Sequence, residues 1–344
     1  MPKPKHIVII RLSAMGDVAM TVPVLRAFSM QHADVKITVV SRPFFEPFFN
    51  DIPNLNFFPI DLKERHKGLL GLWRLFLDLR KLEVTHFADL HNVLRSQVVR
   101  TFFNLSGINV AATDKGRTDK KALTRKKNKI FEPVNSMFER HVETFKKLGF
   151  SVDLSSPVFP NRAKLSIDII EIIGSNNQKL IGIAPFAQYD SKVYPLDLTQ
   201  IVIDELAKEE AFKIILFGGG NEEIQKLNAL KGNHSNVIVI AGKIKLKQEL
   251  ELISNLDVML SMDSGNAHLA AMLGVKVITL WGATHPFAGF KPFDQPLENC
   301  ITSDRDKYPL LPTSIYGNKK VEGYEDAMRS ILPETVVTKV KRPK

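Results

Sequence analysis

Short apolar runs alternate with longer amphipathic segments almost from end to end, and this alternation restricts the possible folds more than any other feature of the chain. In the first half the apolar runs occupy 6–11, 35–41, 56–60, 85–90 and 108–112, with helical patterns over 68–82 and 135–148. In the second half they occupy 180–185, 212–217, 236–240, 257–261 and 276–281, with helical patterns near 197–209, 221–230, 246–255 and 266–273. Strands that alternate with helices in this way predict parallel sheets of the α/β class.

The alternation is interrupted once, near the middle of the chain. The helical pattern ends at Gly149, and Pro157 and Pro160 precede the point where the strands resume. A length of 344 residues also suits two domains of common size. We therefore predict two doubly wound, Rossmann-like domains, 1–160 and 161–344, which face a central cleft and bind ligands at the carboxyl ends of their strands. The last helix is a candidate to return to the first domain.

The net charge of +10 is concentrated in residues 115–129, which hold eight Lys or Arg and one Asp. Such a run is either a solvated loop or a clamp for an anionic partner, such as acidic headgroups or a phosphorylated glycan. Nucleic acid is not expected as a partner, because no aromatic residue lies among these charges to stack on bases. The C-terminal "KVKRPK" is a second basic segment that could assist at a membrane surface.

The sequence carries no sign of a membrane span or of a metal centre. No apolar stretch reaches the roughly 18 to 20 residues that cross a bilayer, so we expect a cytoplasmic protein. The single cysteine, Cys300, excludes an internal disulfide and a cysteine-rich metal site. The one D-x-D sequence, at 304–306, lies in a polar loop where a solvated turn is expected. We therefore expect no metal and no cofactor.

The stretch "RLSAMGDV" (11–18) places Ser13, Gly16 and Asp17 at the exit of the first predicted strand. Gly16 permits a tight turn, and the amides that follow begin a helix whose N-terminus attracts negative charge. Asp17 is either the N-cap of that helix or a general base at the cleft. The spacing matches neither the dinucleotide fingerprint nor the P-loop, so neither kind of nucleotide site is predicted here.

A second stretch, "SMDSGNAHLAAMLGVKVITLWGAT" (261–284), places Asp263, Ser264 and Gly265 in a turn before a helix of small residues. Free amides at that helix N-terminus, with no side chain on Gly265, suit a diphosphate. His268 lies on the first turn of this helix. It either donates a hydrogen bond to a phosphate oxygen or packs on the sheet as an ordinary helix residue.

Two further loops follow strands of the same predicted sheet. "APFAQYDSKVYP" (184–195) contains Lys192, and "FGGGNEE" (217–223) ends in Glu222 and Glu223. A lysine can neutralise phosphate charge, and a carboxylate at a strand end can accept both hydroxyls of a ribose. Each residue alone is also compatible with a solvated loop or a first helical turn, but together they predict a nucleotide pocket.

Taken together, these four stretches resemble glycosyltransferase family nine, the ADP-heptose:lipopolysaccharide heptosyltransferases, and the resemblance covers nearly the whole chain in the expected order. It implies the GT-B architecture, with the acceptor bound mainly by the first domain and the nucleotide sugar mainly by the second. One departure is "DLHNVLRS" (89–96), where many members read D-L-Q-G, so the acceptor contacts at this position stay open.

The resemblance also implies roles for individual residues. Asp17 looks like the catalytic base, in an acceptor-side loop with Ser13 and Gly16. Lys192 is similar to the lysine that contacts the donor phosphates. The turn that holds the diphosphate is matched by Asp263, Ser264, Gly265 and His268. Glu222 and Glu223 compete for the carboxylate on the adenosine side.

The expected activity is therefore an inverting, metal-independent transfer of heptose from ADP-heptose to a lipopolysaccharide core or lipid-A-linked acceptor. Peripheral contact with the cytoplasmic face of the inner membrane is a further expectation. One alternative is an enzyme of the same fold with another nucleotide sugar. The other is a non-catalytic protein that binds nucleotide sugars or anionic glycans, which detectable turnover would exclude.

Overall fold

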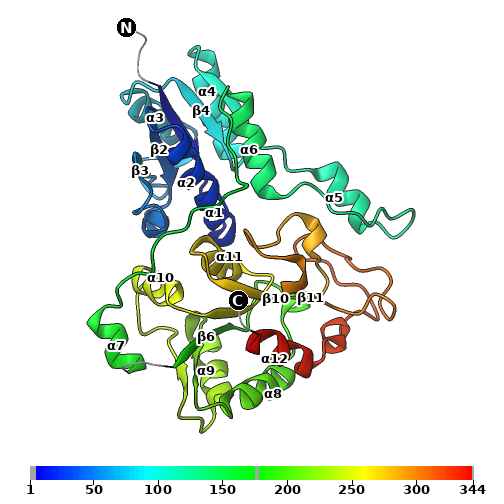
Figure 1. The fold of residues 1–344 in the computed structure, drawn as a ribbon. Helices are drawn as coiled ribbons and strands as arrows, with labels where there is room; N and C mark the ends of the chain where they lie inside the picture. Colours follow the sequence, from blue (N-terminus) through cyan, green and yellow to red (C-terminus); the bar gives the residue numbers. More distant parts are fainter. Residues whose placement is uncertain (1–4, 175–177, 343–344) are drawn as a thin grey trace. The chain divides into compact units, whose positions relative to one another are not determined.

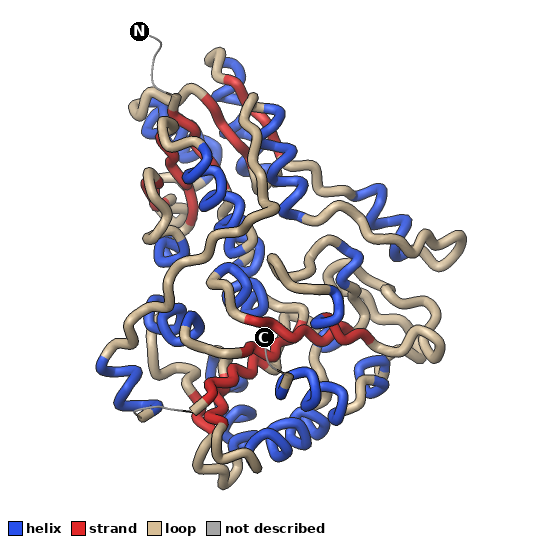
Figure 2. Tube along the Cα trace, viewed as in Figure 1, coloured by secondary structure: helices blue, strands red, loops and turns tan. Residues whose placement is uncertain are grey.

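The computed structural model describes residues 5–174 and 178–342, which form two compact units (Figure 1). The first unit comprises the described residues up to Lys115 together with Asn135–Phe159. The second comprises Gly116–Val134 and the described residues from Pro160 onward. Each unit is built on its own parallel sheet, as the red strands of Figure 2 show, so the predicted α/β class with doubly wound sheets is confirmed.

The sheet of the first unit has the order β3-β2-β1-β4-β5. Its strands are β1 (His6–Ile10), β2 (Lys36–Ser41), β3 (Leu55–Pro59), β4 (His86–Asp89) and β5 (Asn109–Ala112), and every neighbouring pair is parallel. All five residues of β1 are buried, because this strand lies in the middle of the sheet and is covered on both faces. The strand order reverses between β1 and β4. The loops that leave the carboxyl ends of these two strands therefore lie at the edge where α/β proteins bind ligands.

The helices of the first unit are α1 (Met15–Ala19), α2 (Thr21–Gln31), α3 (Gly68–Arg80), α4 (Leu94–Leu105) and α6 (Met137–Lys147), with a 3₁₀ turn, η1, over Pro43–Phe48. Helix α3 begins and ends close to the pattern predicted over 68–82. Its buried face contributes Leu75 and Phe76 to the core, and Trp73 packs edge-on against Phe102 of α4, with ring centroids 5.0 Å apart.

The sheet of the second unit has the order β11-β10-β9-β6-β7-β8. Its strands are β6 (Lys179–Ala184), β7 (Phe212–Leu216), β8 (Val237–Val239), β9 (Val258–Met262), β10 (Lys276–Trp281) and β11 (Cys300–Thr302). The first five were predicted to within two residues at each end. Strand β11 was missed, because three partly exposed residues give no apolar run to detect. The order reverses between β6 and β9, which makes the exits of these strands the expected ligand-binding edge.

The helices of the second unit are α5 (Arg117–Thr124), α7 (Ile167–Ile173), α8 (Leu196–Ala207), α9 (Gly220–Lys231), α10 (Leu246–Ser254), α11 (Gly265–Met272) and α12 (Pro333–Lys341). The expectation that the last helix returns to the first domain is not met. Val336 and Val340 of α12 are fully buried in the core of the second unit, and α12 lies beside α8 (Figure 1). Lys341 adds an ion pair to Glu209, at the end of α8, with Nζ and Oε1 2.6 Å apart. No helix among the described residues combines the length and the apolarity needed to cross a bilayer.

The basic stretch at 115–129 is only partly a solvated surface. The backbone N–H of Val134 donates to the carbonyl of Phe287 at 3.0 Å, and Lys129 donates to the carbonyl of Pro312 at 2.8 Å. Lys120 is buried, with its ammonium 4.2 Å from the centroid of the Phe290 ring. Arg117, Lys121 and residues 125–127 remain exposed. Gly116–Val134, here called the basic arm, is therefore fixed on the second unit on one side and presents cations to solvent on the other.

One buried hydrogen bond fastens the beginning of the second unit to its end. The hydroxyl of Tyr194, after β6, donates to the carbonyl of Ile331, just before α12, at 2.7 Å. Tyr194→Phe keeps the ring but leaves that buried carbonyl without its donor, so the free energy of unfolding should fall by about 1 to 3 kcal/mol. Urea unfolding followed by circular dichroism measures this. Tyr189→Phe, in the same loop but only partly buried, is the matched control, and equal stability of the two variants would contradict the assignment.

Candidate functional site

The loop after β1 holds Asp17 by two contacts within the first unit. Asp17 is the third residue of α1, and its Oδ2 accepts a hydrogen bond from the N–H of Ala14 at 3.2 Å. The same oxygen lies 2.9 Å from Nη2 of Arg11, and the Asp17 side chain is 33% exposed. Ala14 occupies the N-cap position, so the interpretation of Asp17 as the N-cap is wrong. Gly16 lies inside α1 and not in a separate turn.

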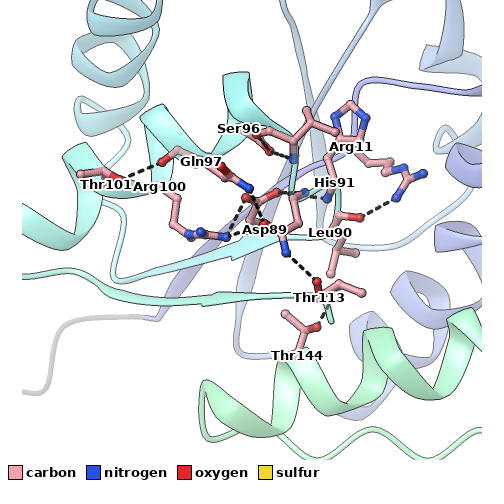
Figure 3. Close-up of polar contacts among 12 residues, drawn as sticks. Arg11, Asp89, Leu90, His91, Ser96, Gln97, Arg100, Thr101, Thr113 and Thr144 are labelled. Atoms are coloured by element: carbon pink, nitrogen blue, oxygen red, sulfur yellow. Dashed lines mark hydrogen bonds and ion pairs between the residues drawn. The ribbon is translucent and has the colours of Figure 1, made fainter. Parts of the chain in front are cut away.

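Arg11 ties this loop to the one after β4. Its guanidinium donates to the carbonyl of Ser13 at 2.9 Å and to the carbonyl of Leu90 at 2.7 Å, the second contact being drawn in Figure 3. With the ion pair to Asp17, three acceptors hold a guanidinium that is almost fully buried. Arginine suits this position because its planar fork of donors is fixed in direction. The Asp17 carboxylate is thereby oriented by both loops.

The loop after β4 is itself held by a buried carboxylate. Asp89 Oδ1 accepts from the N–H groups of His91 and Asn92, at 3.1 and 2.6 Å, and Oδ2 pairs with Arg100 at 3.0 Å (Figure 3). Asp89 is fully buried, and this burial raises its pKa. The result is a rigid loop that places the His91 ring beside the loop after β1.

His91 is a site residue that the sequence analysis did not single out. Its Nε2 lies 3.5 Å from the Ser13 hydroxyl, and its Nδ1 is buried without a hydrogen-bond partner among the described residues. Burial, aided by the positive charges of Arg11 and Lys115, lowers the pKa of His91 to about 4. A neutral imidazole with an unsatisfied polar atom next to Asp17 is suited to contact a hydroxyl-rich ligand. In the sequence, only the unusual stretch "DLHNVLRS" (89–96) could have pointed to His91 as a site residue.

In the second unit, three strand exits converge on one carboxylate. Lys192 follows β6, Asp263 follows β9 and Thr284 follows β10. Lys192 Nζ lies 2.9 Å from Asp263 Oδ2, and the Thr284 hydroxyl donates to the same oxygen at 2.8 Å. The lysine and aspartate side chains are only 13% and 7% exposed. The sequence predicted both of these residues at the donor site, and the structure brings them into direct contact.

Two glycines make room for the loop that carries Lys192. A Cβ on Gly282 would lie 2.4 Å from the carbonyl oxygen of Ser191, which accepts a 3.0 Å hydrogen bond from the N–H of Ala283. Gly317 has a φ of +83°, and a Cβ there would lie 2.6 Å from Cδ of Lys192. A larger residue would therefore displace Ser191 or Met328 at position 282 and Lys192 at position 317. Gly317 was missed, because a lone glycine in a long loop gives no motif.

The start of α11 lies on the same edge of the sheet. Ser264 is the N-cap residue and Gly265 the first helical residue, so backbone N–H groups of the first turn have no partners within the helix. The Ser264 hydroxyl is 3.1 Å from that of Ser261. His268 is buried on the first turn, and both interpretations of it stay open.

The structure separates the two glutamates that follow the glycine turn. Glu223 Oε2 accepts from the N–H of Gly219 at 2.7 Å and so folds back onto the turn. Glu222 points away, forming a 2.6 Å ion pair with Lys226, which lowers the pKa of this carboxyl. Its side chain is 82% exposed. Of the two, Glu223 is the carboxylate that touches the glycine turn.

The D-x-D sequence at 304–306 forms a turn: Asp304 Oδ1 accepts from the N–H of Asp306 at 2.8 Å. Among the described residues, no three His, Cys, Asp or Glu side chains are grouped as metal ligands.

The depressed pKa of His91 makes stability depend on pH. Because the folded protein holds this imidazole neutral down to about pH 4, the unfolded chain binds an extra proton between about pH 6.5 and 4. Stability therefore falls as the pH is lowered through this window. From pH 7.5 to 5.0, His91→Gln should lose about 2 kcal/mol less free energy of unfolding than the parent. Urea titrations of both proteins at the two pH values measure this, and parallel losses would contradict it.

The chain is similar to known proteins over nearly its whole length. The chain is 25% identical to the lipopolysaccharide core heptosyltransferase OpsX of Haemophilus influenzae, over 98% of this chain and 97% of the relative. The structure of a family 9 glycosyl transferase from Veillonella parvula superposes with a TM-score of 0.76 at 18% identity, covering 99% of this chain and 97% of that one. The ADP-heptose lps heptosyltransferase II of E. coli superposes with a TM-score of 0.68 at 20% identity, covering 97% of each chain.

These superpositions confirm the GT-B fold of two Rossmann-like domains. The sequence profile described as glycosyltransferase family 9 (heptosyltransferase) matches residues 72–314, a span that includes the Asp89 loop, Lys192, the glycine turn and the Asp263 turn. The match covers well over half of the chain. The protein is therefore a glycosyltransferase that belongs to family 9, the heptosyltransferase family.

Proposed function

We propose that this protein is an inverting, metal-independent enzyme that transfers heptose from ADP-heptose to a sugar of the lipopolysaccharide inner core. The observation that carries the proposal is the buried contact between Lys192 and Asp263 at the switch point of the second sheet. Family membership supports sugar transfer, and the names of the relatives, a lipopolysaccharide core enzyme and an ADP-heptose enzyme, support this donor and acceptor.

At the donor site, Lys192 would stabilise the departing diphosphate. An ammonium has three N–H donors, so Lys192 can keep its contact with Asp263 and still donate to phosphate oxygens. Asp263, oriented by Thr284, fixes where that charge sits. The N–H groups at the start of α11 add a second set of donors for the diphosphate. We assign the charge stabilisation to these protein groups, so no metal ion is required.

At the acceptor site, Asp17 would act as the general base. The acceptor hydroxyl attacks the anomeric carbon and gives its proton to the carboxylate, while the bond from that carbon to the diphosphate breaks and its electron pair leaves with ADP. Attack from the face opposite the leaving group inverts the configuration. Arg11 orients the carboxylate for this step. Ser13 and His91, at the same loops, are proposed to contact hydroxyls of the acceptor sugar.

On the adenosine side, we propose Glu223 as the carboxylate that meets the ribose, because it lies against the glycine turn. Glu222 is the alternative. The acceptor is lipid-linked in this proposal, so the enzyme would work in the cytoplasm at the inner membrane surface. Nucleic acid is not a proposed partner, because the exposed cations of the basic arm lack interleaved aromatic residues.

The proposal is tested by incubating the protein with a panel of nucleotide sugars and purified lipid-linked core acceptors, and reading the mass of the product. A mass increase of one heptose, with ADP-heptose alone and in the presence of EDTA, is the expected result. Transfer from a different nucleotide sugar would show that ADP-heptose is not the donor. Loss of turnover in EDTA that magnesium or manganese restores would overturn the metal-free mechanism.

Asp17→Asn removes the proposed base and the negative charge that pairs with Arg11, while keeping the size of the side chain. The amide has the size of the carboxylate but cannot take up the proton, so turnover should fall by about 10² to 10⁴ while ADP affinity stays nearly unchanged. Steady-state kinetics and calorimetry measure the two quantities. Asp51→Asn is the matched control, since Asp51 also pairs with an arginine of the first unit, Arg26, at 2.7 Å. Near-normal turnover in a folded Asp17→Asn protein would leave the base unidentified.

Lys192→Ala tests the donor site. Loss of a charge-assisted contact should weaken ADP binding by about 1.5 to 3 kcal/mol. Lys208→Ala, which removes an exposed lysine paired with Glu205 in the same unit, should leave ADP affinity unchanged. Because Lys192→Ala also leaves Asp263 without its cation, the thermal unfolding of each variant is measured beside the calorimetry. Equal ADP affinity in the parent and in a folded Lys192→Ala protein would show that the pocket is misplaced.

A further inference from the structure

Helix α3 presents a row of large apolar side chains to solvent. Leu69, Leu70, Trp73 and Leu77 are 66%, 75%, 44% and 40% exposed, whereas Leu72, Leu75, Phe76 and Leu79 on the other side are buried in the core. At 3.6 residues per turn, the four exposed residues occupy one continuous arc of about 100°. We call this arc, with its flanking cations, the α3 face. Single exposed leucines are ordinary on a protein surface, but four large apolar residues along one helix are not.

The charges around this arc are mostly positive. Residues 63–83 contain six Lys or Arg and three Asp or Glu. Arg74 and Lys81 are exposed and lie beside one edge of the apolar arc, past Leu70, and Arg80, also exposed, lies within the angular range of the arc at the last residue of the helix. The one acid within α3, Asp78, is largely covered and accepts two hydrogen bonds from Arg65, at 2.8 Å each. The α3 face is therefore apolar from Leu69 to Leu77 and cationic along one edge and at its C-terminal end.

We propose that the α3 face docks on the surface of an anionic lipid bilayer. Its leucines and Trp73 would enter the boundary between headgroups and acyl chains, and the flanking cations would contact anionic headgroups. Tryptophan favours this interfacial depth, and long basic side chains can lie along apolar surface while their charges reach the headgroups. The inference deepens the proposed function, because a lipid-linked acceptor requires the enzyme to work at a bilayer surface.

The charges on the α3 face favour an anionic bilayer over a second copy of the chain as its partner. Two α3 faces in contact would bring Arg74, Arg80 and Lys81 of both copies together, and like charges at an interface are unfavourable. An anionic bilayer complements them. Charge also distinguishes α3 from α7, where Ile167 and Ile170 are 73% and 42% exposed. Helix α7 carries Asp168 and Glu171 between and beside these residues, so an anionic surface would repel it.

The chain carries its own reporter for this proposal. Of its two tryptophans, Trp73 lies in the α3 face and Trp281 is only 1% exposed. Vesicles of phosphatidylglycerol and phosphatidylethanolamine should shift the emission of the full chain to shorter wavelength, and lipids brominated on the acyl chain should quench it. Phosphatidylcholine vesicles should do so at least about tenfold more weakly, because they offer no net negative charge.

Two double variants test whether binding depends on the α3 face or on exposed apolar residues anywhere on the protein. Leu69→Gln with Leu70→Gln keeps Trp73 and the helix propensity, and it should lower partitioning onto the anionic vesicles by about tenfold or more. Ile167→Gln with Ile170→Gln, on α7, is the matched control and should change partitioning less than about twofold. ADP binding by calorimetry confirms that both variants are folded, since neither pair lies in the donor site.

Three results would overturn the proposal. The first is an unchanged Trp73 emission with anionic vesicles, and the second is an equal loss of binding in both variant pairs. The third is a dimer, seen by sedimentation without lipid, that Leu69→Gln with Leu70→Gln dissociates, which would assign the face to a contact between copies. No sugar substrate is present in these measurements. Failure of the docking proposal can therefore be distinguished from failure of the proposed heptose transfer.

Discussion

Parallel strand pairing is the constraint from which the organisation of this enzyme follows. When all strands of a sheet run the same way, the loops that leave their carboxyl ends emerge along one edge, however far apart they are in the sequence. Lys192, Asp263 and Thr284 meet for this reason, since β6, β9 and β10 are adjacent in the second sheet. The same geometry joins the loops after β1 and β4 through Arg11 in the first unit.

Buried charge is the second recurring feature of both sites. Arg11, Asp89 and Asp263 are each more than nine-tenths buried, and removing such groups from water costs several kcal/mol unless partners compensate. Each has an ion pair, and each also makes hydrogen bonds to loop atoms. An apolar cluster would hold the loops together with a smaller desolvation penalty. We therefore infer that the charged groups are needed to orient side chains at the two sites. They fix where a carboxylate and an ammonium lie, which a hydrophobic contact cannot do.

The sequence predicted what depends on local pattern and missed what depends on distant partners. Ten strands and the residues of the Lys192 and Asp263 loops could be found because apolar runs and small-residue turns are visible in a short window. Strand β11 is too short to show such a run, and α12 could be placed only once Val336 and Val340 were seen in the core of the second unit. His91 and Gly317 gain their importance from neighbours more than 70 residues away, which no local pattern encodes. The basic stretch was interpreted from its charge, although Lys120 and Lys129 are held by Phe290 and Pro312.

The basic arm has a consequence for how the protein is made. It is synthesised in the middle of the first unit, between β5 and α6, yet the carbonyls to which Lys129 and Val134 donate belong to Phe287, Leu310 and Pro312. A ribosome releases the chain from its N-terminus, and the first unit is complete once Phe159 has emerged. About 130 further residues must follow before the partner of Val134 has been synthesised, and more before those of Lys129. For that interval the arm lacks the contacts that hold it on the second unit in the finished protein. Assembly of the second unit then covers Lys120 and holds Lys129, while residues 125–127 stay exposed.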